Sequence, residues 1–217
     1  MSIKILLADD HGIIREGLRS LLEKEPDIKV IGEAQDGRKA FELTQQLQPD
    51  IVIIDITMPN LNGIDAARQI TSNFPKVKVI ALSIHSNRRF VANMLKAGAS
   101  GYVLKESLFD ELTHAIRAVT ANGTYLSPKI ASMVIDDYVE RLSTTAEPKL
   151  EVLTSREREV LQLLAEGKST KQTAAELYVS SKAIEANRRQ IMKKLNIHNI
   201  AELTKYAIRE GLTSLES

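Results

Sequence analysis

Short apolar runs alternate with amphipathic stretches over the first half of the chain. The runs IVIID and KVIAL are hydrophobic at nearly every position, which is typical of strands buried on both faces of a parallel sheet. Five such runs, each followed by a stretch with helical periodicity, predict five β–α units with helices on both faces of the sheet. We expect strands at residues 4–8, 29–32, 50–55, 77–82 and 101–104, and helices at 12–25, 37–48, 63–73, 87–97 and 107–121.

The pattern changes after residue 122. Residues 123–149 begin in a turn and end in small and polar residues around Pro148, so we interpret them as a connector, within which Ala131–Leu142 could form a helix. From residue 150 onwards the pattern is helical throughout. We therefore divide the chain into an N-terminal domain over 1–122, the connector over 123–149 and a C-terminal domain over 150–217.

Capping signals predict four short helices in the C-terminal domain. The segments Thr154–Glu157 and Ser169–Gln172 match the capping box, and Asn199 is a suitable N-cap. Only three residues, Tyr178–Ser180, separate the second helix from the third, which is the spacing of a helix-turn-helix. The expected helices cover residues 155–166, 170–177, 181–195 and 200–210, with Gly167 and Gly211 as C-caps.

The composition excludes several kinds of functional site. The chain has no cysteine, which excludes disulfides, thiolate nucleophiles and cysteine-ligated metal sites. No apolar run approaches the roughly 18 residues of a membrane span, and no signal peptide precedes the first strand. We expect a cytoplasmic protein without a membrane partner. The net charge is +1 over 217 residues, and the N-terminal domain is neutral, with fifteen basic and fifteen acidic residues.

Acidic residues follow two of the expected strands. If the first and third strands are neighbours, Asp9, Asp10 and Asp55 meet at one edge of the sheet. Clustered carboxylates disfavour one another's ionisation unless a cation lies among them, and hard oxygen ligands favour Mg²⁺. The sequence therefore predicts a magnesium site. Each acid also has an ordinary explanation: Asp9 and Asp10 could cap the next helix, and Asp55 could be a turn residue.

Two further polar residues end the fourth and fifth strands. Ser83 and Lys105 would bring a hydroxyl and a cation to the same crevice, although Ser83 alone indicates nothing and Lys105 alone could be a solvated residue. A carboxylate acceptor, a divalent metal, a hydroxyl and a lysine together predict a phosphoryl-transfer site. His11, at the start of the first helix, is assigned no role.

The motifs ADDH, VIIDITMPNLNG, ALSIH and GYVLK resemble the receiver domain of two-component response regulators over residues 1–122. The resemblance implies a flavodoxin-like five-stranded sheet with the strand order 2-1-3-4-5. It also implies that Asp55 accepts a phosphoryl group from a histidine kinase, and that Asp10, Asp55 and the Thr57 carbonyl hold Mg²⁺, with Asp9 acting through water. Ser83 and Lys105 would contact the phosphoryl oxygens, and Tyr102 would move with Ser83. Glu106 departs from the family's usual proline, which puts a cis peptide bond after Lys105 in doubt.

The third helix of the C-terminal domain, SKAIEANRRQIMKKL, is basic on one side. Ile184, Ile191 and Leu195 form an apolar stripe, and residues 180–198 carry five basic residues against one acidic residue. As the second helix of a helix-turn-helix, it is expected to enter the major groove of double-stranded DNA. The alternative is a solvated basic face. The candidate DNA-binding residues are Lys171, Lys182, Glu185, Ala186, Arg188, Arg189, Lys193 and Lys194.

Side-chain chemistry divides these residues by role. Arg189 could read guanine, Glu185 could accept from cytosine and Ala186 could meet a thymine methyl group. Lys171, Arg188, Lys193 and Lys194 suit phosphates, and phosphate contacts give affinity with little sequence information.

Residues 153–211 also resemble the LuxR-type DNA-binding domain. Three departures from its pattern are Ala183 and Asn187, on the basic helix, and Thr173, which we expect to weaken core packing slightly. The resemblance implies that the last helix contributes to dimerisation, with Leu203 and Ile208 as candidates for that role or for the core.

Together these features predict a response regulator of the NarL/FixJ type: a phosphorylated receiver that drives a DNA-binding transcriptional regulator, dimeric when phosphorylated or bound to DNA. We expect no turnover enzyme, because a receiver only transfers phosphate to and from its own aspartate. Two alternatives stay open. One is a DNA-binding regulator that acts without phosphorylation. The other is a Mg²⁺-dependent phosphatase with an aspartyl-phosphate intermediate, although Ile56 and Thr57 follow Asp55 where a second catalytic acid would be needed.

Overall fold

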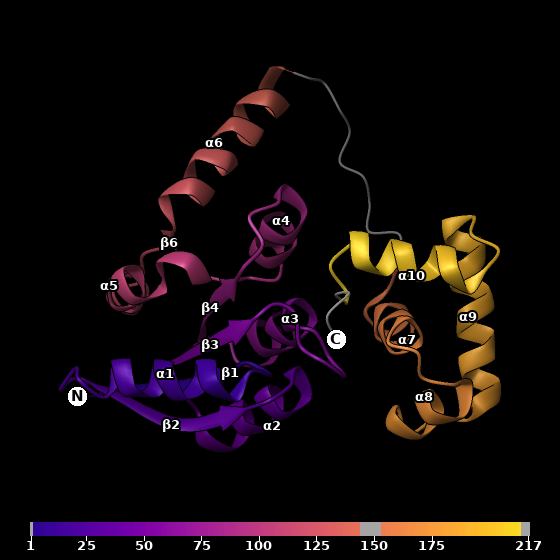
Figure 1. The fold of residues 1–217 in the computed structure, drawn as a ribbon, viewed down its shortest axis with the longest axis horizontal. Coiled ribbons are helices and arrows are strands. Elements are labelled where there is room, and N and C mark those ends of the chain that lie inside the picture. The colour runs from indigo at the N-terminus through magenta and orange to yellow at the C-terminus, as the bar shows by residue number, and fades with distance from the viewer. Residues whose placement is uncertain (1, 144–152, 214–217) are drawn as a thin grey trace. The chain divides into compact units, whose positions relative to one another are not determined.

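The computed structural model describes residues 2–143 and 153–213 (Figure 1). The chain divides into two compact units, formed mainly by residues before 144 and mainly by residues after 152. The expected boundary between the connector and the C-terminal domain, at residues 149 and 150, lies outside the described residues. Each unit is considered by itself.

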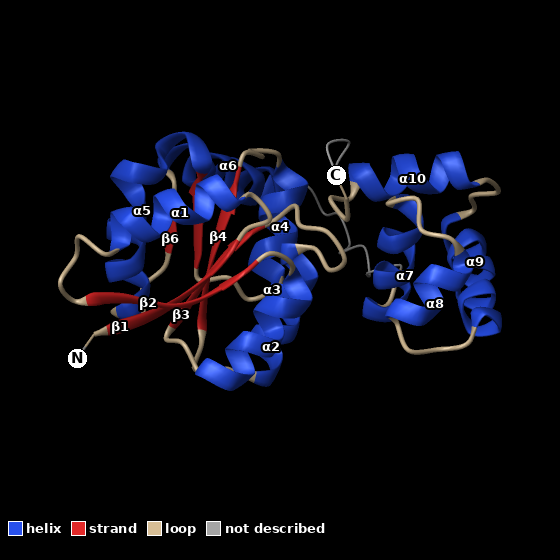
Figure 2. Ribbon diagram, turned by 60° about the horizontal axis from the view of Figure 1, so that its bottom comes forward, coloured by secondary structure: helices blue, strands red, loops and turns tan. Residues whose placement is uncertain are grey.

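The N-terminal unit is built around a parallel sheet with helices on both faces (Figure 2). Within the described residues the sheet has six strands in the order β2-β1-β3-β4-β5-β6. The first five strands have the predicted order. The strands are β1 (Ile3–Ala8), β2 (Ile28–Ala34), β3 (Ile51–Asp55), β4 (Lys78–Ser83), β5 (Gly101–Leu104) and β6 (Tyr125–Leu126).

The sixth strand corrects the prediction of five strands. Tyr125 and Leu126 lie in the predicted connector and pair in parallel with Gly101 and Tyr102 of β5. Two residues are too few to show a periodic pattern, so this strand could not be recognised from the sequence.

The helices of the N-terminal unit follow the prediction within a few residues. Helix α1 ends at Leu22 rather than at residue 25, because the residue before Pro26 is disfavoured in helical conformation. The helices are α1 (Gly12–Leu22), α2 (Gly37–Leu47), α3 (Gly63–Asn73), α4 (Arg88–Lys96), α5 (Leu108–Thr120) and α6 (Pro128–Ser143), with a single 3₁₀ turn at Lys105–Ser107.

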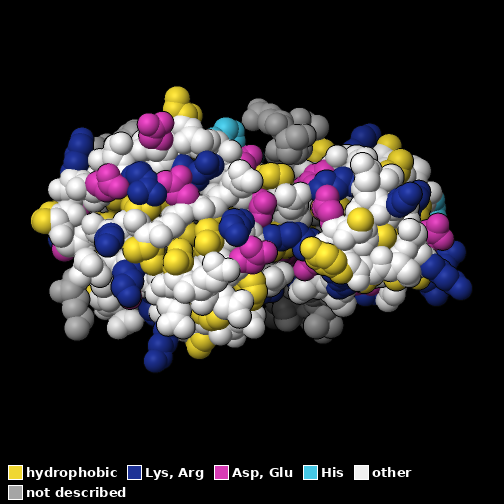
Figure 3. Space-filling view, turned by 90° about the horizontal axis from the view of Figure 1, so that it is seen from below, with side chains coloured by type: hydrophobic (Ala, Val, Ile, Leu, Met, Phe, Trp, Pro, Cys, Tyr) yellow, Lys and Arg dark blue, Asp and Glu magenta, His cyan; other side chains and the backbone are white. Residues whose placement is uncertain are grey.

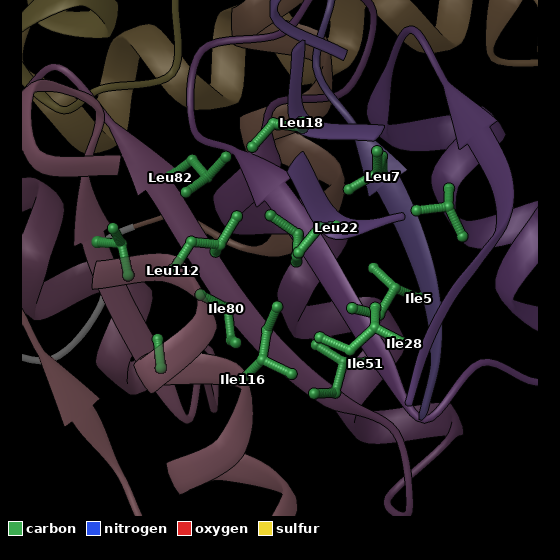
Figure 4. Packing of buried hydrophobic residues seen from close by; sticks show 14 of the residues in the cluster. Ile5, Leu7, Leu18, Leu22, Ile28, Ile51, Ile80, Leu82, Leu112 and Ile116 are labelled. Carbon is green, nitrogen blue, oxygen red and sulfur yellow. The ribbon is translucent and has the colours of Figure 1, made fainter. Parts of the chain in front are cut away.

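The core on one face of the sheet holds β1, β3 and β4 against α1 and α5 (Figure 4). Leu18 and Leu22 of α1 and Leu112 and Ile116 of α5 are at most 2% exposed and pack on the aliphatic side chains of the strands. Burying an aliphatic side chain of this size contributes about 1.5–3 kcal/mol. This core fixes the strand ends on which the candidate site is built.

Helix α6 occupies most of the predicted connector. It begins at Pro128, earlier than the predicted Ala131, because proline is well suited to the first position of a helix. The helix packs on α4, where Arg88 lies 3.0 Å from Asp137 and 2.8 Å from Glu140. Helix α6 thus extends the N-terminal unit into the predicted connector.

Hydrogen bonds of Ser127 join the start of α6 to β5. Its backbone N–H donates to the Tyr102 carbonyl over 2.9 Å. Its hydroxyl oxygen accepts from the Leu104 N–H over 3.1 Å, and the hydroxyl also donates to Glu111 of α5. Because Ser127 is 1% exposed, these bonds are shielded from water.

The C-terminal unit contains the predicted helices. Both predicted capping boxes are present, at Thr154 with Glu157 and at Ser169 with Gln172. The core includes Ile184, Ile191 and Leu203, each at most 1% exposed. The helices are α7 (Ser155–Ala165), α8 (Thr170–Glu176), α9 (Ser181–Leu195) and α10 (Ile200–Arg209). Across the part of the chain that the structure describes, no helix combines the length and apolarity of a membrane span.

Candidate functional site

The predicted carboxylates do meet at the carboxyl edge of the sheet. Asp9 follows β1 and Asp55 ends β3, and β1 and β3 are neighbours. Asp9 and Asp55 are only 1% and 2% exposed, whereas Asp10 faces solvent. One ligand atom from each of these acids, and one from His11, lie within 4.8 Å of one another. We call Asp9, Asp10, Asp55 and Lys105 the acid pocket.

Lys105 lies between the two buried acids. Its Nζ is 2.7 Å from Asp9 Oδ2 and 3.0 Å from Asp55 Oδ2. Burial disfavours the charged lysine, but Asp55 and Asp9 outweigh that effect, and the pKa of Lys105 is raised. The pocket therefore contains a permanent cation that partly neutralises the two carboxylates.

The Asp55 carboxyl group is unusually basic. Burial, and then the charge of Asp9, raise its pKa to about 6, while Lys105 and the Ile56 N–H, which donates to Asp55 Oδ1 over 2.8 Å, oppose the rise. Asp55 is thus mainly ionised at neutral pH but close to its titration range. An ionised carboxylate with raised basicity is suited to act as a nucleophile.

The loop after β3 is held very close to Asp55. The Gly63 N–H donates to the Ile56 carbonyl over 2.8 Å, and Asn62 caps α3 by accepting from the Asp65 N–H. A Cβ atom on Gly63 would lie 1.9 Å from the Asp55 carbonyl oxygen, so only glycine fits there without movement of the backbone. Thr57, whose carbonyl was expected to bind a metal, is half-buried in this loop.

Ser83 and Tyr102 hold the loop after β4. Ser83 follows Leu82, the β4 partner of Asp55, and its hydroxyl oxygen accepts from the His85 N–H over 2.8 Å. The Tyr102 hydroxyl donates to the His85 carbonyl over 2.8 Å. Burial raises the pKa of Tyr102 to about 12, so the phenol stays protonated and can donate. Ser83, Tyr102 and Lys105 thus lie at the carboxyl edge of the sheet. Ser83 and Tyr102 both hydrogen-bond to His85.

His11 is closer to the acids than expected. The ring Nδ1 of His11 lies 2.8 Å from Asp10 Oδ1 and 3.2 Å from Asp9 Oδ1. The backbone N–H of His11 donates to Asp9 Oδ1 over 2.9 Å. The residue is also the N-cap of α1, as a helix-start residue. Its position directly after Asp10 was the sequence signal that could have associated it with the pocket.

The peptide bond after Lys105 is trans, since no cis bond occurs within residues 2–143 or 153–213. Glu106 is exposed, and its carboxylate lies 3.4 Å from Lys129 of α6. The departure at Glu106 therefore does not alter the acid pocket directly.

The basic face of α9 is presented to solvent. Figure 3 shows Lys and Arg side chains gathered at the end of the C-terminal unit where α9 lies. Ile184 and Ile191 are buried on the opposite side. The candidate residues Lys171, Lys182, Glu185, Ala186, Arg189, Lys193 and Lys194 are exposed, and Arg188 is half-buried.

Lys194 differs from the other candidates. Its Nζ lies 2.7 Å from Glu157 Oε2, and the Glu157 side chain is 4% exposed. Burial disfavours the charged Glu157, but Lys194 and the backbone and side chain of Thr154 outweigh it and lower the pKa of Glu157. Lys194 thus joins α9 to α7, which is a structural contact that its position on the helix did not reveal.

The three departures from the LuxR pattern have local effects. Asn187 Nδ2 donates to the Ala183 carbonyl over 2.9 Å, so these two residues are linked along α9. Thr173 is fully buried, and its hydroxyl finds no hydrogen-bond partner among the described residues. A buried unsatisfied hydroxyl is destabilising, which is a different effect from the weaker packing predicted for Thr173, and that prediction stays untested. Leu203 lies in the core, whereas Ile208 is half-buried.

Two family models match the chain. The response regulator receiver domain matches residues 5–117, and the model of bacterial regulatory proteins, luxR family, matches residues 151–207. These matches coincide with the acid pocket and with the helix-turn-helix, respectively.

Two curated relatives match nearly the whole chain. The transcriptional regulatory protein DegU of Brevibacillus brevis is 36% identical over 223 residues, covering 96% of this chain and 94% of that protein. The oxygen regulatory protein NreC of Staphylococcus carnosus is 34% identical over 215 residues, covering 97% and 99%.

Solved structures agree in fold. The RcsB response regulator of Salmonella typhimurium aligns with a TM-score of 0.64 and 26% identity over 96% of this chain and 98% of that one. An RcsB–DNA complex aligns with a TM-score of 0.60 and 26% identity over 97% and 99%. The chain therefore belongs to the two-component response regulators of the NarL/FixJ type, in which a receiver domain is joined to a LuxR-type DNA-binding domain.

Proposed function

We propose that Asp55 accepts a phosphoryl group from a histidine kinase, and that this modification controls how α9 binds double-stranded DNA at a promoter. The observation that carries the proposal is the convergence of two buried carboxylates on Lys105, with Nζ–Oδ distances of 2.7 and 3.0 Å. Burying these charged groups costs desolvation free energy, and titratable groups perturbed in this way are concentrated at functional sites.

In the proposed reaction an Asp55 carboxylate oxygen attacks the phosphorus of the kinase phosphohistidine. The P–N bond breaks, an acyl phosphate forms, and the leaving imidazole keeps the bonding electron pair and takes up a proton. The cation of Lys105 would pair with a phosphoryl oxygen instead of with the Asp55 carboxylate. The hydroxyl of Ser83 would donate a hydrogen bond to another phosphoryl oxygen, while its own oxygen can still accept from the His85 N–H.

The donor set of the acid pocket fits a magnesium ion. Asp9, Asp10 and Asp55 supply hard carboxylate oxygens close together, and the Thr57 carbonyl lies in the adjoining loop. Asp10, Asp55 and the Thr57 carbonyl would hold the ion, and Asp9 would act through water. When bound, Mg²⁺ supplies charge neutralisation for the transferred phosphoryl group.

We propose that the phosphoryl group shifts an existing equilibrium between two conformations of the β4–α4 loop. Ser83 and Tyr102 both bind His85, so recruitment of Ser83 to phosphate would change the contacts of the whole loop. Tyr102 would move with it. The expected output is a dimer that presents two α9 helices to a two-fold related site, consistent with solved RcsB dimers on DNA. We propose that the protein acts in the cytoplasm, where promoter DNA is accessible to it.

The phosphatase alternative is less well supported. That chemistry needs a second acid two residues after the nucleophile, where this chain has Thr57. We therefore assign no turnover activity beyond transfer to and hydrolysis from Asp55. The domain assignment that accompanies the proposal is 1–122 for the receiver, 123–149 for the connector and 150–217 for the DNA-binding domain.

The test is phosphate incorporation from labelled acetyl phosphate. Asp55→Asn should reduce incorporation to background, because no acceptor oxygen anion remains. Asp50→Asn is the matched control: Asp50 precedes the same strand and binds the Lys4 N–H over 2.7 Å, away from the pocket. Continued labelling of Asp55→Asn would contradict the assignment, whereas normal labelling of Asp50→Asn shows that a nearby charge change is tolerated.

A further inference from the structure

The turn of the helix-turn-helix contains an aromatic residue in an unfavourable backbone conformation. Tyr178 has a φ of 53°, in the left-handed region, and its side chain is 94% exposed. Its N–H donates to the Ala175 carbonyl over 3.2 Å, and the Val179 N–H donates to the Ala174 carbonyl over 3.0 Å. These bonds close α8, and they require a left-handed residue after the helix.

Glycine or asparagine normally occupies such a position, because a Cβ atom crowds the backbone there. The same unit uses Gly167 after α7, Asn196 after α9 and Gly211 after α10, with φ values of 83°, 53° and 75°. Tyr178 is the only aromatic residue with positive φ in the described chain. Its exposed ring gains almost nothing from packing, so the folded monomer alone gives no reason for tyrosine at this position.

Tyr178 adjoins the end of α9 that faces DNA in the proposed function. Ser180, two residues later, caps α9 by accepting from the Ala183 N–H over 3.2 Å. In a docked helix-turn-helix, the first residues of the recognition helix meet base edges, and the flanking backbone contacts come from neutral donors as well as from lysine and arginine. A tyrosine hydroxyl on a long rigid side chain is such a donor.

We propose that the Tyr178 hydroxyl donates a hydrogen bond to a DNA phosphate oxygen beside the groove that α9 enters. The inference rests on the proposed DNA-binding function and adds a residue outside the basic face of α9. Because the donor is neutral, the contact adds affinity on any sequence and displaces no counterion.

The test compares Tyr178→Phe, Tyr178→Gly and Lys171→Ala in the full chain. Binding to a short random-sequence DNA duplex is followed by fluorescence anisotropy over a range of salt concentrations, and thermal unfolding is measured in parallel. Tyr178→Phe should weaken binding roughly 10- to 150-fold, as expected for a hydrogen bond to a charged group. The slope of log affinity against log salt should not change, whereas Lys171→Ala should reduce that slope by about 1. Tyr178→Gly should weaken binding at least as much, with a Tm no lower than that of the wild type.

Wild-type affinity in Tyr178→Phe would overturn the proposal. If transcription nevertheless fell in that variant, the hydroxyl would instead contact a protein partner. A reduced salt slope in Tyr178→Phe would also contradict a neutral phosphate contact. If the wild-type chain itself did not bind the duplex, and Lys171→Ala had no effect, the proposed DNA-binding function would fail rather than this inference.

Discussion

The acid pocket and the basic face of α9 are built in opposite ways. The pocket brings together residues from separate strand ends, with Asp9 and Lys105 separated by 96 positions in sequence, and its key carboxylates are buried. The basic face uses residues within one helix, and most of them are exposed. In the pocket each charge changes the energy of its neighbours, whereas water and salt screen the charges on α9 from one another. Substitutions in the pocket should therefore be strongly coupled, and those on α9 nearly additive.

The largest effect is expected where the pocket depends on close backbone contact. Gly63→Ala would place a methyl group 1.9 Å from the Asp55 carbonyl oxygen, so the end of β3 must move. We expect a loss of about 3 kcal/mol in the free energy of unfolding and a severe loss of phosphate incorporation. Gly17→Ala is the matched control, because a Cβ there meets nothing within 4 Å and lies inside α1. It should stabilise the protein by about 0.5–1 kcal/mol. Equal behaviour of the two variants in chemical denaturation would contradict the geometry at Gly63.

A pH-dependent effect should follow from the buried charge of Asp55. Its pKa in the folded protein is about 6, compared with about 3.9 in an unfolded chain. A carboxyl group whose pKa is raised by folding contributes stability below the unfolded pKa and loses that contribution as the pH rises through the folded value. In chelator, Asp55→Asn should therefore be more stable than the wild type at pH 7, by about 1–3 kcal/mol, and the difference should disappear near pH 4. A difference that did not vary with pH would show that ionisation is not its cause.

On α9 the effects should be smaller and confined to DNA binding. Arg189→Ala should cost about 1–3 kcal/mol of binding free energy and relax specificity at one base pair. The Tm should not change, because Arg189 is exposed. Arg188→Ala, as the comparison variant, should weaken binding evenly across sequences. Selection of binding sites from a random DNA pool measures both outcomes, and an unchanged site preference in Arg189→Ala would contradict the proposed readout.

Lys194 allows the contrast between buried, coupled charges and exposed, independent charges to be tested within α9 itself. Lys194→Met removes the partner of the buried Glu157 carboxylate, whereas Lys193→Met removes an exposed charge. We expect Lys194→Met to lower the free energy of unfolding by about 1–2 kcal/mol, and Lys193→Met to leave it unchanged while reducing the salt slope of DNA binding. If the two variants were equally stable, the contact with Glu157 would contribute little.

The sequence predicts the pocket because strand ends in a parallel sheet are geometrically constrained. The fully apolar residues of β3 identify a central strand, and its last residue, Asp55, must then lie at the carboxyl edge beside β1 and β4. The same reasoning places Ser83 and Lys105. Strand order follows from the family resemblance rather than from the pattern of apolar residues.

Other contacts depend on geometry that no local pattern contains. The pair of Lys194 and Glu157 is 37 positions apart and depends on how α9 crosses α7. The strand β6 has only two residues, which are too few to show a periodic pattern. Pro128 could be predicted either to interrupt a helix or to begin one, and in the structure it begins α6. For His11 the sequence shows that it adjoins Asp10, but the distances of its ring from Asp9 and Asp10 depend on the backbone at the start of α1.

Because Ser127 is hydrogen-bonded to β5, the orientation of α6 depends on the position of that strand. Tyr102 lies in β5, and Lys105 directly follows it. The Tyr102 carbonyl and the Leu104 N–H of this strand hydrogen-bond to Ser127, and α6 starts at the residue after Ser127. Sixteen helical residues span about 24 Å. A tilt of about 5° at the base of such a rod displaces its far end by about 2 Å. A small displacement of β5 would therefore be magnified along α6 up to residue 143, because α6 begins directly after Ser127.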